Sequence, residues 1–339
     1  MQRLKYSGNH SDVICILTQK TEGVNQLFTG DFYQSRIERL SVRDFEAQKG
    51  DYGKLLCIGG SFGMAGAAFL SGLAAFRSGI GMVRYFGPES NRMILQTLLP
   101  EAMYTSGSRR SASTCSGFRS LESAPEDVLS EEELDAALSW SDAVIAGPGL
   151  STGGFAREIM HFLLKTDLSR KRIVLFDADA LNIIADEGLR FSGPAGGEKT
   201  NIVITPHVGE MSRLTGKSIG EIKMHPEETA LSFSRKENVV TVLKDAVTVI
   251  ASPEGNVFLN NSGHAAMAKA GSGDVLTGII AGVTAVLKED VLAGAVCADY
   301  IHGRAGELAA ARYGDHGTLA RDIANEIPNV MRKENGTGL

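Results

Sequence analysis

Short apolar runs alternate with helical patterns along this chain from Lys54 onward, and this alternation constrains the fold more than any other feature. Each run is only three to five residues long, and apolar residues at helical spacing separate most of the runs. Such an order predicts βαβ units and therefore a central, mostly parallel sheet with helices on both faces. The predicted strands are 54–58, 82–86, 143–146, 173–176, 202–204, 239–243, 247–251 and 257–259.

Three segments depart from this rhythm. The turn residues Pro-Glu-Gly-Asn at 253–256 separate the last two predicted strands, which indicates a hairpin and a sheet that is mixed near one edge. The stretch 105–126 is rich in serine and poor in large apolar residues, so we expect a mobile surface loop. Residues 1–40 lack the alternation and are expected to be an N-terminal extension, which leaves residues 41–335 as one large α/β domain.

The charge and cysteine content exclude several classes of protein. A net charge of −6 argues against a nucleic-acid surface, which needs clustered lysine and arginine. No apolar run approaches the roughly 18 residues of a membrane span, and the N-terminus has no signal-like apolar segment, so a cytoplasmic protein is expected. The four cysteines are scattered without zinc-type spacing, and we interpret them as packing residues: Cys15, Cys57, Cys115 and Cys297.

The glycine turn at 271–274, Gly-Ser-Gly-Asp, is the most informative motif because it directly precedes an apolar helical pattern. The first N–H groups of a helix lack internal partners and the helix dipole favours anions there, so this turn predicts a phosphate or oxyanion cradle. Asp274 beside such a cradle can take a proton from a substrate hydroxyl. The simpler interpretation is that Asp274 or Ser272 only caps the helix.

A second glycine turn, starting Gly59-Gly60-Ser61, follows the first predicted strand and opens a helix of small residues. It lacks the G-x-G-x-x-G order of a dinucleotide-binding Rossmann unit, and no acidic residue ends the strand at 82–86. A hydride-transfer site is therefore disfavoured.

Other candidate residues stand at the carboxyl ends of predicted strands, where open α/β sheets bind ligands. Gly147 and Gly149 follow the strand 143–146 and are either ligand contacts or ordinary turn residues. Asp177 and Asp179 follow the strand 173–176 and could position Mg²⁺ or substrate hydroxyls. For Asp179, capping of the next helix is an equal alternative.

Two further strand ends carry charged or titratable side chains. His207 and Glu210 follow the strand 202–204, and they are either a ligand-binding pair or a Pro-His turn in which Glu210 stabilises the next helix. Neither has a neighbour at zinc-type spacing. Lys244 follows the strand 239–243 and is either a nucleotide-binding cation or a solvated strand-end lysine.

Together these motifs resemble the ADP/ATP-dependent NAD(P)H-hydrate dehydratase family, which has a ribokinase-like fold. The resemblance covers residues 41 to 332. Its most specific motifs are Lys-Gly-Asp-Tyr-Gly-Lys at 49–54, Gly-Gly-Ser-x-x-Met-x-Gly-Ala at 59–67, Gly-Pro-Gly-Leu at 147–150, Asp-Ala-Asp-Ala-Leu-Asn at 177–182, Thr-Pro-His-x-Gly-Glu at 205–210 and Gly-x-Gly-Asp-Val-Leu-Thr-Gly at 271–278.

The resemblance implies a dehydration of the S-epimer of hydrated NADH or NADPH, driven by ADP or ATP with Mg²⁺. It implies that Asp274 is the catalytic base and that the protein is a homotetramer. It assigns no metal ligand, and Asp177 and Glu210 are the candidates at the strand ends. It implies substrate contacts at Ala67, Gly147, Gly149, His207 and Asp274. It implies adenine-nucleotide contacts at Lys244, Asp245, Ala246, Val247, Thr248, Gly271 and Gly273.

The chain departs from the family pattern at three positions, Asp245, Ala270 and Val208, where the family usually has two glycines and a proline. Asp245 matters most, because its carboxylate would repel a polyphosphate unless Mg²⁺ intervenes or the side chain turns away. The family is often fused to an epimerase domain, and 40 leading residues are too few for one, so a separate epimerase is expected. A small-molecule kinase of the same fold and a non-catalytic dinucleotide sensor are the alternative functions.

Overall fold

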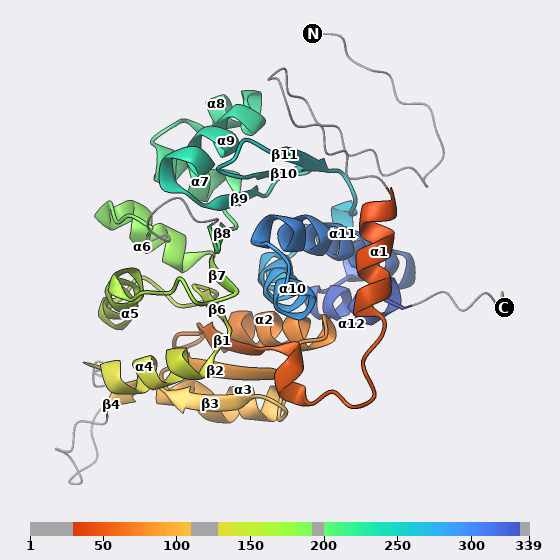
Figure 1. Cartoon of the computed structure of the whole chain (residues 1–339). Helices are drawn as coiled ribbons and strands as arrows, with labels where there is room; N and C mark the ends of the chain where they lie inside the picture. The colour runs from red at the N-terminus through yellow and green to blue at the C-terminus, as the bar shows by residue number, and fades with distance from the viewer. Residues whose placement is uncertain (1–29, 110–127, 192–199, 333–339) are drawn as a thin grey trace.

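The computed structural model describes residues 30–109, 128–191 and 200–332, and nine of its strands form one sheet. The strands of this sheet are β1 (Lys54–Ile58), β2 (Met82–Gly87), β3 (Met103–Ser106), β6 (Ala143–Ala146), β7 (Ile173–Phe176), β8 (Ile202–Ile204), β9 (Val240–Leu243), β10 (Thr248–Ala251) and β11 (Val257–Asn260). Their spatial order is β11-β10-β9-β8-β7-β6-β1-β2-β3 (Figure 1). A separate pair is formed by β4 (Ser108–Arg109) and β5 (Val128–Leu129).

The strands from β9 across to β3 are all parallel, and β10 and β11 add an antiparallel hairpin at one edge. This confirms the predicted mixed edge. A parallel neighbour requires a crossover connection, so a helix follows most of the parallel strands. The helices are α1 (Gly30–Leu40), α2 (Ala65–Arg77), α3 (Arg92–Leu98), α4 (Glu131–Trp140), α5 (Gly154–Lys165), α6 (Asp179–Glu187), α7 (Val208–Thr215), α8 (Ile219–Met224), α9 (Pro226–Glu237), α10 (Ser272–Leu287), α11 (Val291–Gly317) and α12 (Ala320–Val330).

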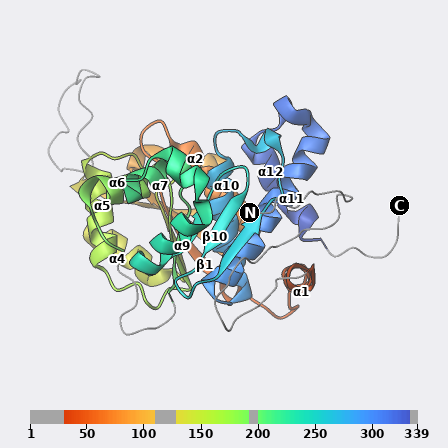
Figure 2. The same ribbon diagram turned by 90° about the horizontal axis from the view of Figure 1, so that it is seen from above.

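The helices form two layers, one on each face of the sheet (Figures 1 and 2). One core lies between the sheet and α2, α10, α11 and α12, and the other lies between the sheet and α4, α5, α6, α7 and α9. Alternate residues of each strand enter alternate cores. In β1, for example, Leu55 and Cys57 face the first core, whereas Leu56 and Ile58 face the second.

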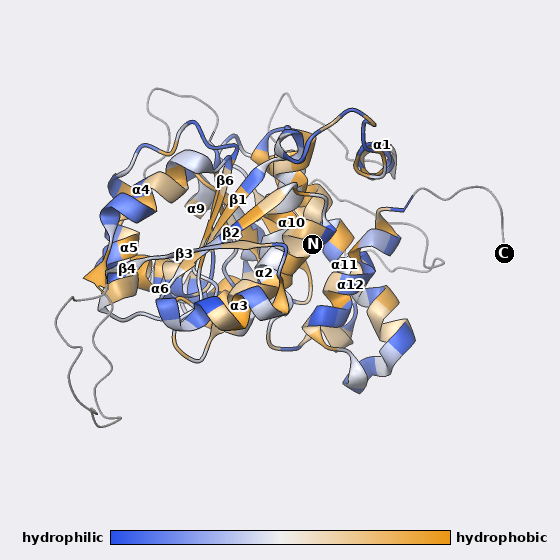
Figure 3. Ribbon diagram, turned by 90° about the horizontal axis from the view of Figure 1, so that it is seen from below, coloured by the Kyte–Doolittle hydropathy of each residue, from blue (hydrophilic) through white to orange (hydrophobic). Residues whose placement is uncertain are grey.

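Burial on both faces explains why the central strands are continuous apolar runs, which Figure 3 colours orange. The predicted α/β architecture, a mostly parallel sheet covered on both faces, is therefore confirmed. Of the four cysteines, Cys57 and Cys297 are buried free thiols as expected, while Cys15 and Cys115 lie outside the described residues. None of the helices in the described ranges is long and apolar enough to cross a membrane.

Helix α1 and strands β3, β4 and β5 were not predicted. Helix α1 lies within the expected N-terminal extension, and its buried Tyr33 packs against Tyr300 of α11 with ring centroids 4.4 Å apart. Strands β3 and β4 overlap the start of the stretch 105–126 that was expected to be a loop, so that expectation is wrong for residues 105, 106, 108 and 109. The part of that stretch from 110 to 126 lies outside the described residues.

Candidate active site

The predicted site residues meet at one edge of the sheet because they follow neighbouring parallel strands. The turns after β1, β6, β7 and β8 and the residue after β9 stand side by side, about 4.8 Å apart from strand to strand. They carry Gly59-Gly60, Gly147–Leu150, Asp177–Asp179, His207–Glu210 and Lys244. The first turn of α10 reaches the same edge, since the Gly273 backbone lies beside Lys244.

The glycine turn before α10 leaves the start of that helix uncapped. Gly271 is the N-cap residue at φ +92°, a left-handed conformation that favours glycine, and none of the described side chains caps the helix. Asp274 lies in the first turn without capping it, so the capping interpretation is wrong for both Ser272 and Asp274. The N–H of Ser272 donates to the backbone carbonyl of Lys269 at 3.2 Å, whereas the next N–H groups of the first turn, those of Gly273 and Asp274, remain available to an anion.

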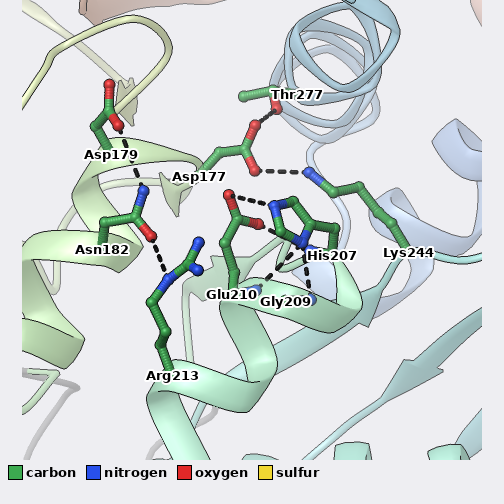
Figure 4. Close-up of polar contacts among 9 residues, drawn as sticks. All are labelled: Asp177, Asp179, Asn182, His207, Gly209, Glu210, Arg213, Lys244 and Thr277. Carbon is green, nitrogen blue, oxygen red and sulfur yellow. Dashed lines mark hydrogen bonds and ion pairs between the residues drawn. The ribbon is translucent and has the colours of Figure 1, made fainter. Parts of the chain in front are cut away.

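Lys244 and Asp177 form a buried ion pair behind this turn (Figure 4). The Lys244 Nζ atom lies 2.8 Å from Asp177 Oδ1, and the hydroxyl of Thr277 donates to Asp177 Oδ2 at 2.8 Å. The Asp177 side chain is only 2% exposed and that of Lys244 is 20% exposed. The interpretation of Lys244 as a solvated lysine is therefore wrong.

The Lys244 ammonium also borders the glycine turn. A Cβ atom built on Gly273 would lie 3.3 Å from Lys244 Nζ, so nothing bulkier than glycine separates the ammonium from the first turn of α10. Burial lowers the pKa of Lys244, but the carboxylates of Asp177 and Glu210 outweigh burial and raise it. The lysine therefore stays charged beside the candidate anion cradle.

Asp274 has the electrostatic character of a general base. Burial, followed by the charge of Asp177, raises the pKa of Asp274 to about 7, against the lowering effect of Lys244. Asp179 and Glu210 add smaller increases. A carboxyl group whose pKa lies near the ambient pH can both accept and release a proton efficiently.

The turn after β8 forms a local hydrogen-bonded cap. His207 Nδ1 accepts hydrogen bonds from the backbone N–H groups of Gly209 at 2.9 Å and Glu210 at 3.2 Å, and Glu210 Oε2 accepts the His207 N–H at 2.8 Å. This confirms the stabilised-turn interpretation. The imidazole is 53% exposed, and burial together with the charge of Lys244 lowers its pKa, so His207 is neutral at pH 7. Its contact with a ligand stays a prediction.

The two glycines after β6 make close approaches that a side chain would prevent. A Cβ atom on Gly149, at φ +61°, would lie 2.7 Å from the carbonyl oxygen of Met64 and 3.0 Å from Ala67 Cβ. A Cβ atom on Gly147 would lie 1.8 Å from the carbonyl oxygen of Asp177. Packing thus requires a glycine at position 147. Gly149 lies against Ala67, and both residues were predicted to contact the substrate.

Asp179 does not cap α6, since Ala178 is the N-cap residue and no described side chain caps that helix. Instead Asp179 Oδ2 accepts the backbone N–H of Ser151 at 2.8 Å, which ties the turn after β7 to the turn after β6. Asn182 connects Asp179 to Arg213 of α7 (Figure 4). The capping alternative is wrong.

Sequence reasoning missed several members of this network: Ser151, Asn182, Arg213 and Thr277. Only Thr277 left a usable signal, because it stands one helical turn after Gly273 and so shares its face of α10. Ser151 and Arg213 bond residues that are 28 and 31 positions away along the chain, and Asn182 links Asp179 to Arg213.

Asp245, the main departure from the family pattern, is held away from the glycine turn. Its Oδ2 atom lies 3.4 Å from the Nζ atom of Lys223 on α8, and both side chains are exposed. The other residues of the predicted nucleotide segment, Ala246 and Val247, are exposed, and Thr248 is partly buried. The Asp245 side chain has thus turned out, which is one of the two arrangements expected to let a polyphosphate bind there.

The expected Mg²⁺ has no protein-only cage in the described ranges, where no group of three suitable side chains converges. Both oxygens of Asp177 already accept hydrogen bonds. Mg²⁺ commonly binds through one or two carboxylates together with substrate phosphates and water. The residues fit an ion that arrives with a nucleotide, and besides Asp177 the acidic groups Glu210 and Asp274 also raise the pKa of Lys244.

Comparison with known proteins places these observations in a family. A family model described as NAD(P)H-hydrate dehydratase matches residues 55–329. The bifunctional NAD(P)H-hydrate repair enzyme Nnr of Moorella thermoacetica is 36% identical over 91% of this chain, which spans only 54% of that enzyme. The ADP-dependent (S)-NAD(P)H-hydrate dehydratase of Bacillus subtilis is 32% identical over 87% of this chain and 94% of its own length.

A solved structure agrees with the sequence matches. The crystal structure of the ADP/ATP-dependent NAD(P)H-hydrate dehydratase from Bacillus subtilis, co-crystallised with ATP/Mg²⁺, superposes with a TM-score of 0.68 at 31% identity. The match covers 88% of this chain and 95% of that one, so the predicted ribokinase-like architecture is confirmed. With the family model matching most of its length, the chain belongs to the NAD(P)H-hydrate dehydratase family.

Proposed function

We propose that this chain dehydrates the S-epimer of hydrated NADH or NADPH to the working cofactor, with ADP or ATP as the phosphate donor. The observation that carries the proposal is the position of Asp274. Its carboxyl group, with a pKa raised to about 7, stands in the uncapped first turn of α10, and the Lys244 ammonium borders the same turn. A proton acceptor and a phosphate cradle are thus next to each other.

The proposed reaction begins when Asp274 accepts the proton of the hydroxyl group on the hydrated nicotinamide ring. The freed oxygen attacks the terminal phosphorus of the nucleotide, and the bond from that phosphorus to its bridging oxygen breaks. ADP then leaves as AMP, or ATP as ADP. In the second step the ring carbon–oxygen bond breaks, inorganic phosphate departs, and the neighbouring ring carbon loses a proton to form the double bond. Phosphate is a far better leaving group than hydroxide, which is why the nucleotide is consumed.

Phosphoryl transfer depends mainly on positioning and on neutralising charge. The first N–H groups of α10 and the Lys244 ammonium would hold the transferred phosphate, and Asp177 fixes the ammonium in place. Mg²⁺, when bound, would neutralise further phosphate charge. Ala67 and Gly149 would contact the dinucleotide, because they lie against each other and Ser71, one turn after Ala67 on α2, donates to the backbone carbonyl of Asp274.

The adenine nucleotide would lie along Lys244–Thr248, with Gly271 and Gly273 at its phosphates. Support for this placement comes from Asp245, which pairs with Lys223 and so keeps its negative charge away from the turn. The cytoplasmic location, the homotetramer and the separate epimerase stay predictions.

The test is recovery of absorbance at the reduced-nicotinamide band from hydrated NADH and from hydrated NADPH, with ADP and ATP in parallel and Mg²⁺ present. We expect recovery together with one phosphate released per cofactor restored. A small-molecule kinase would instead leave a stable phosphorylated product, and a sensor would bind the dinucleotide without releasing phosphate. Absence of recovery with either nucleotide from a folded preparation would overturn the proposal.

A further inference from the structure

A second cavity opens beside the candidate active site and has no part in the chemistry proposed above. It has a volume of about 270 Å³ and lies between the glycine turn after β1, the turn after β6 and the start of α5. Gly60, Ser61 and Phe62 form one wall, and Leu150 and Phe155 form another.

The cavity lies on the opposite side of Asp274 from the nucleotide segment. Counted along the sheet, Lys244 follows β9, Asp177 follows β7, and the cavity stands over β6, β1 and β2. Two strand spacings, about 10 Å, separate β7 from β1. A substrate whose reacting ring faces the phosphate donor can therefore extend toward this side without meeting the donor.

Helix α2 connects the two places. The hydroxyl of Ser71 donates to the backbone carbonyl of Asp274 at 3.0 Å, and Ala67, one turn earlier, contacts Gly149. Phe62 precedes the helix by a few residues, and the rise of 1.5 Å per residue places the start of α2 roughly 9 Å from Ser71. A ligand with one end at Asp274 that passes Ala67 and Gly149 would thus reach the cavity with its other end.

The walls suit an aromatic, uncharged group. The ring of Phe62 is 90% exposed, although burial of an aromatic side chain is strongly favourable, so its face is available for stacking. Among the described residues that line the cavity there is one carboxylate, Glu158, and no lysine or arginine. These side chains therefore supply no cation for a diphosphate or a second phosphoryl group.

We propose that this cavity binds the adenosine half of the hydrated dinucleotide and that Phe62 stacks on the adenine ring. The inference rests on the proposed function, because it takes the reacting half of the same substrate to lie at Asp274. It assigns the cavity to substrate recognition at a distance from the reaction.

Two variants test the assignment: Phe62→Ala, which removes the stacking surface, and Gly154→Leu, which fills the cavity. Gly154 is the first residue of α5, lines the cavity, and would place a Cβ atom at least 4 Å from every described neighbour. Gly220→Leu is the matched control, since Gly220 also lies in the first turn of a helix, with equally open surroundings, and does not line the cavity.

The measurement compares hydrated NADH with hydrated reduced nicotinamide mononucleotide, which lacks the adenosine half. Base stacking on an aromatic residue contributes about tenfold or more to affinity. We expect each cavity variant to lower the preference for the dinucleotide, taken as the ratio of the two KM values, about tenfold. Gly220→Leu should leave that ratio unchanged. Calorimetric Kd values for the same two ligands give the comparison without turnover.

The inference is overturned if both variants, folded as judged by circular dichroism, keep the wild-type ratio of KM and of Kd. It is also overturned if they weaken both ligands equally, because the cavity would then support the reacting half or the fold. Failure of the proposed function looks different: the wild-type protein would restore neither cofactor, whatever the Kd ratio of the variants.

Discussion

Replacement of Lys244 by methionine tests whether the buried ion pair at the centre of the site has been described correctly. Methionine keeps most of the length of the side chain and removes its charge, leaving Asp177 as a carboxylate that is 2% exposed. Thr277 would then be its remaining hydrogen-bond donor among the contacts described above. Loss of one partner from a buried pair commonly costs about 3–5 kcal/mol, because the other charge stays buried without compensation.

The protein supplies its own comparison in the pair formed by Lys223 and Asp245. There the atoms are 3.4 Å apart, and the side chains are 55% and 44% exposed. Exposed pairs of this kind contribute about 0–1 kcal/mol. Lys244 is itself 20% exposed, so we expect the lower end of the buried range, about 3 kcal/mol, for Lys244→Met and less than about 1 kcal/mol for Lys223→Met.

Equilibrium urea denaturation without nucleotide measures both losses in free energy of unfolding. A third variant closes the cycle: in Lys244→Met with Asp177→Asn the stranded charge is gone, so the double variant should be more stable than Lys244→Met alone. If Lys244→Met cost no more than Lys223→Met, or if the double variant were the least stable of the set, the ion pair would not be the buried contact described here.

Three further outcomes follow from the same geometry. With hydrated NADH and saturating nucleotide, kcat/KM should rise tenfold per pH unit up to about pH 7 and then level off, because Asp274 accepts a proton only when ionised and its pKa is about 7. A flat pH profile would contradict the base role. Asp274→Asn should lose more than nine-tenths of turnover while its calorimetric Kd for the dinucleotide stays within about tenfold of the wild-type value. Gly149→Val should raise the KM for the dinucleotide at least about tenfold, since the valine Cβ would lie 2.7 Å from the Met64 carbonyl oxygen and would displace the start of α2. An unchanged KM would show that Gly149 does not contact the substrate. Asp245→Gly should change the KM for ADP or ATP by less than about threefold, because Lys223 already holds that carboxylate away, and a much larger gain in affinity would mean that Asp245 faces the phosphates.

Strand positions were the most predictable part of the fold. Strands buried on both faces must be apolar throughout, so β1, β6, β7 and β8 appear in the sequence as uninterrupted apolar runs with their observed bounds. Edge strand β3 was not predicted, because it is paired on one side only and leads into a serine-rich stretch. Helix α1 was not predicted, because its buried residues, Phe32 and Tyr33, are adjacent in sequence and give no helical periodicity.

The sequence predicted which residues gather at the candidate site, but it did not predict which of them contact one another. Glycine turns at strand ends and at a helix start are local signals, and they located Gly149, Asp274 and Lys244 correctly at one edge of the sheet. The partners of these residues are set by strand neighbours that are far apart in sequence. The contacts of Asp177 with Lys244 and Thr277 were not predicted, and its expected role in positioning a metal or a substrate hydroxyl stays a prediction.

The sequence by itself determined the sheet, the order of its turns and the helix that begins after Gly271, because apolar period, turn chemistry and helix termini are properties of neighbouring residues. Only the tertiary structure decided which charges face one another. Asp274 has a pKa of about 7 because folding buries it near Asp177, Asp179 and Glu210, which come from two other strand ends. Electrostatic effects depend on distance and burial in three dimensions, and neither can be read from spacing along the chain.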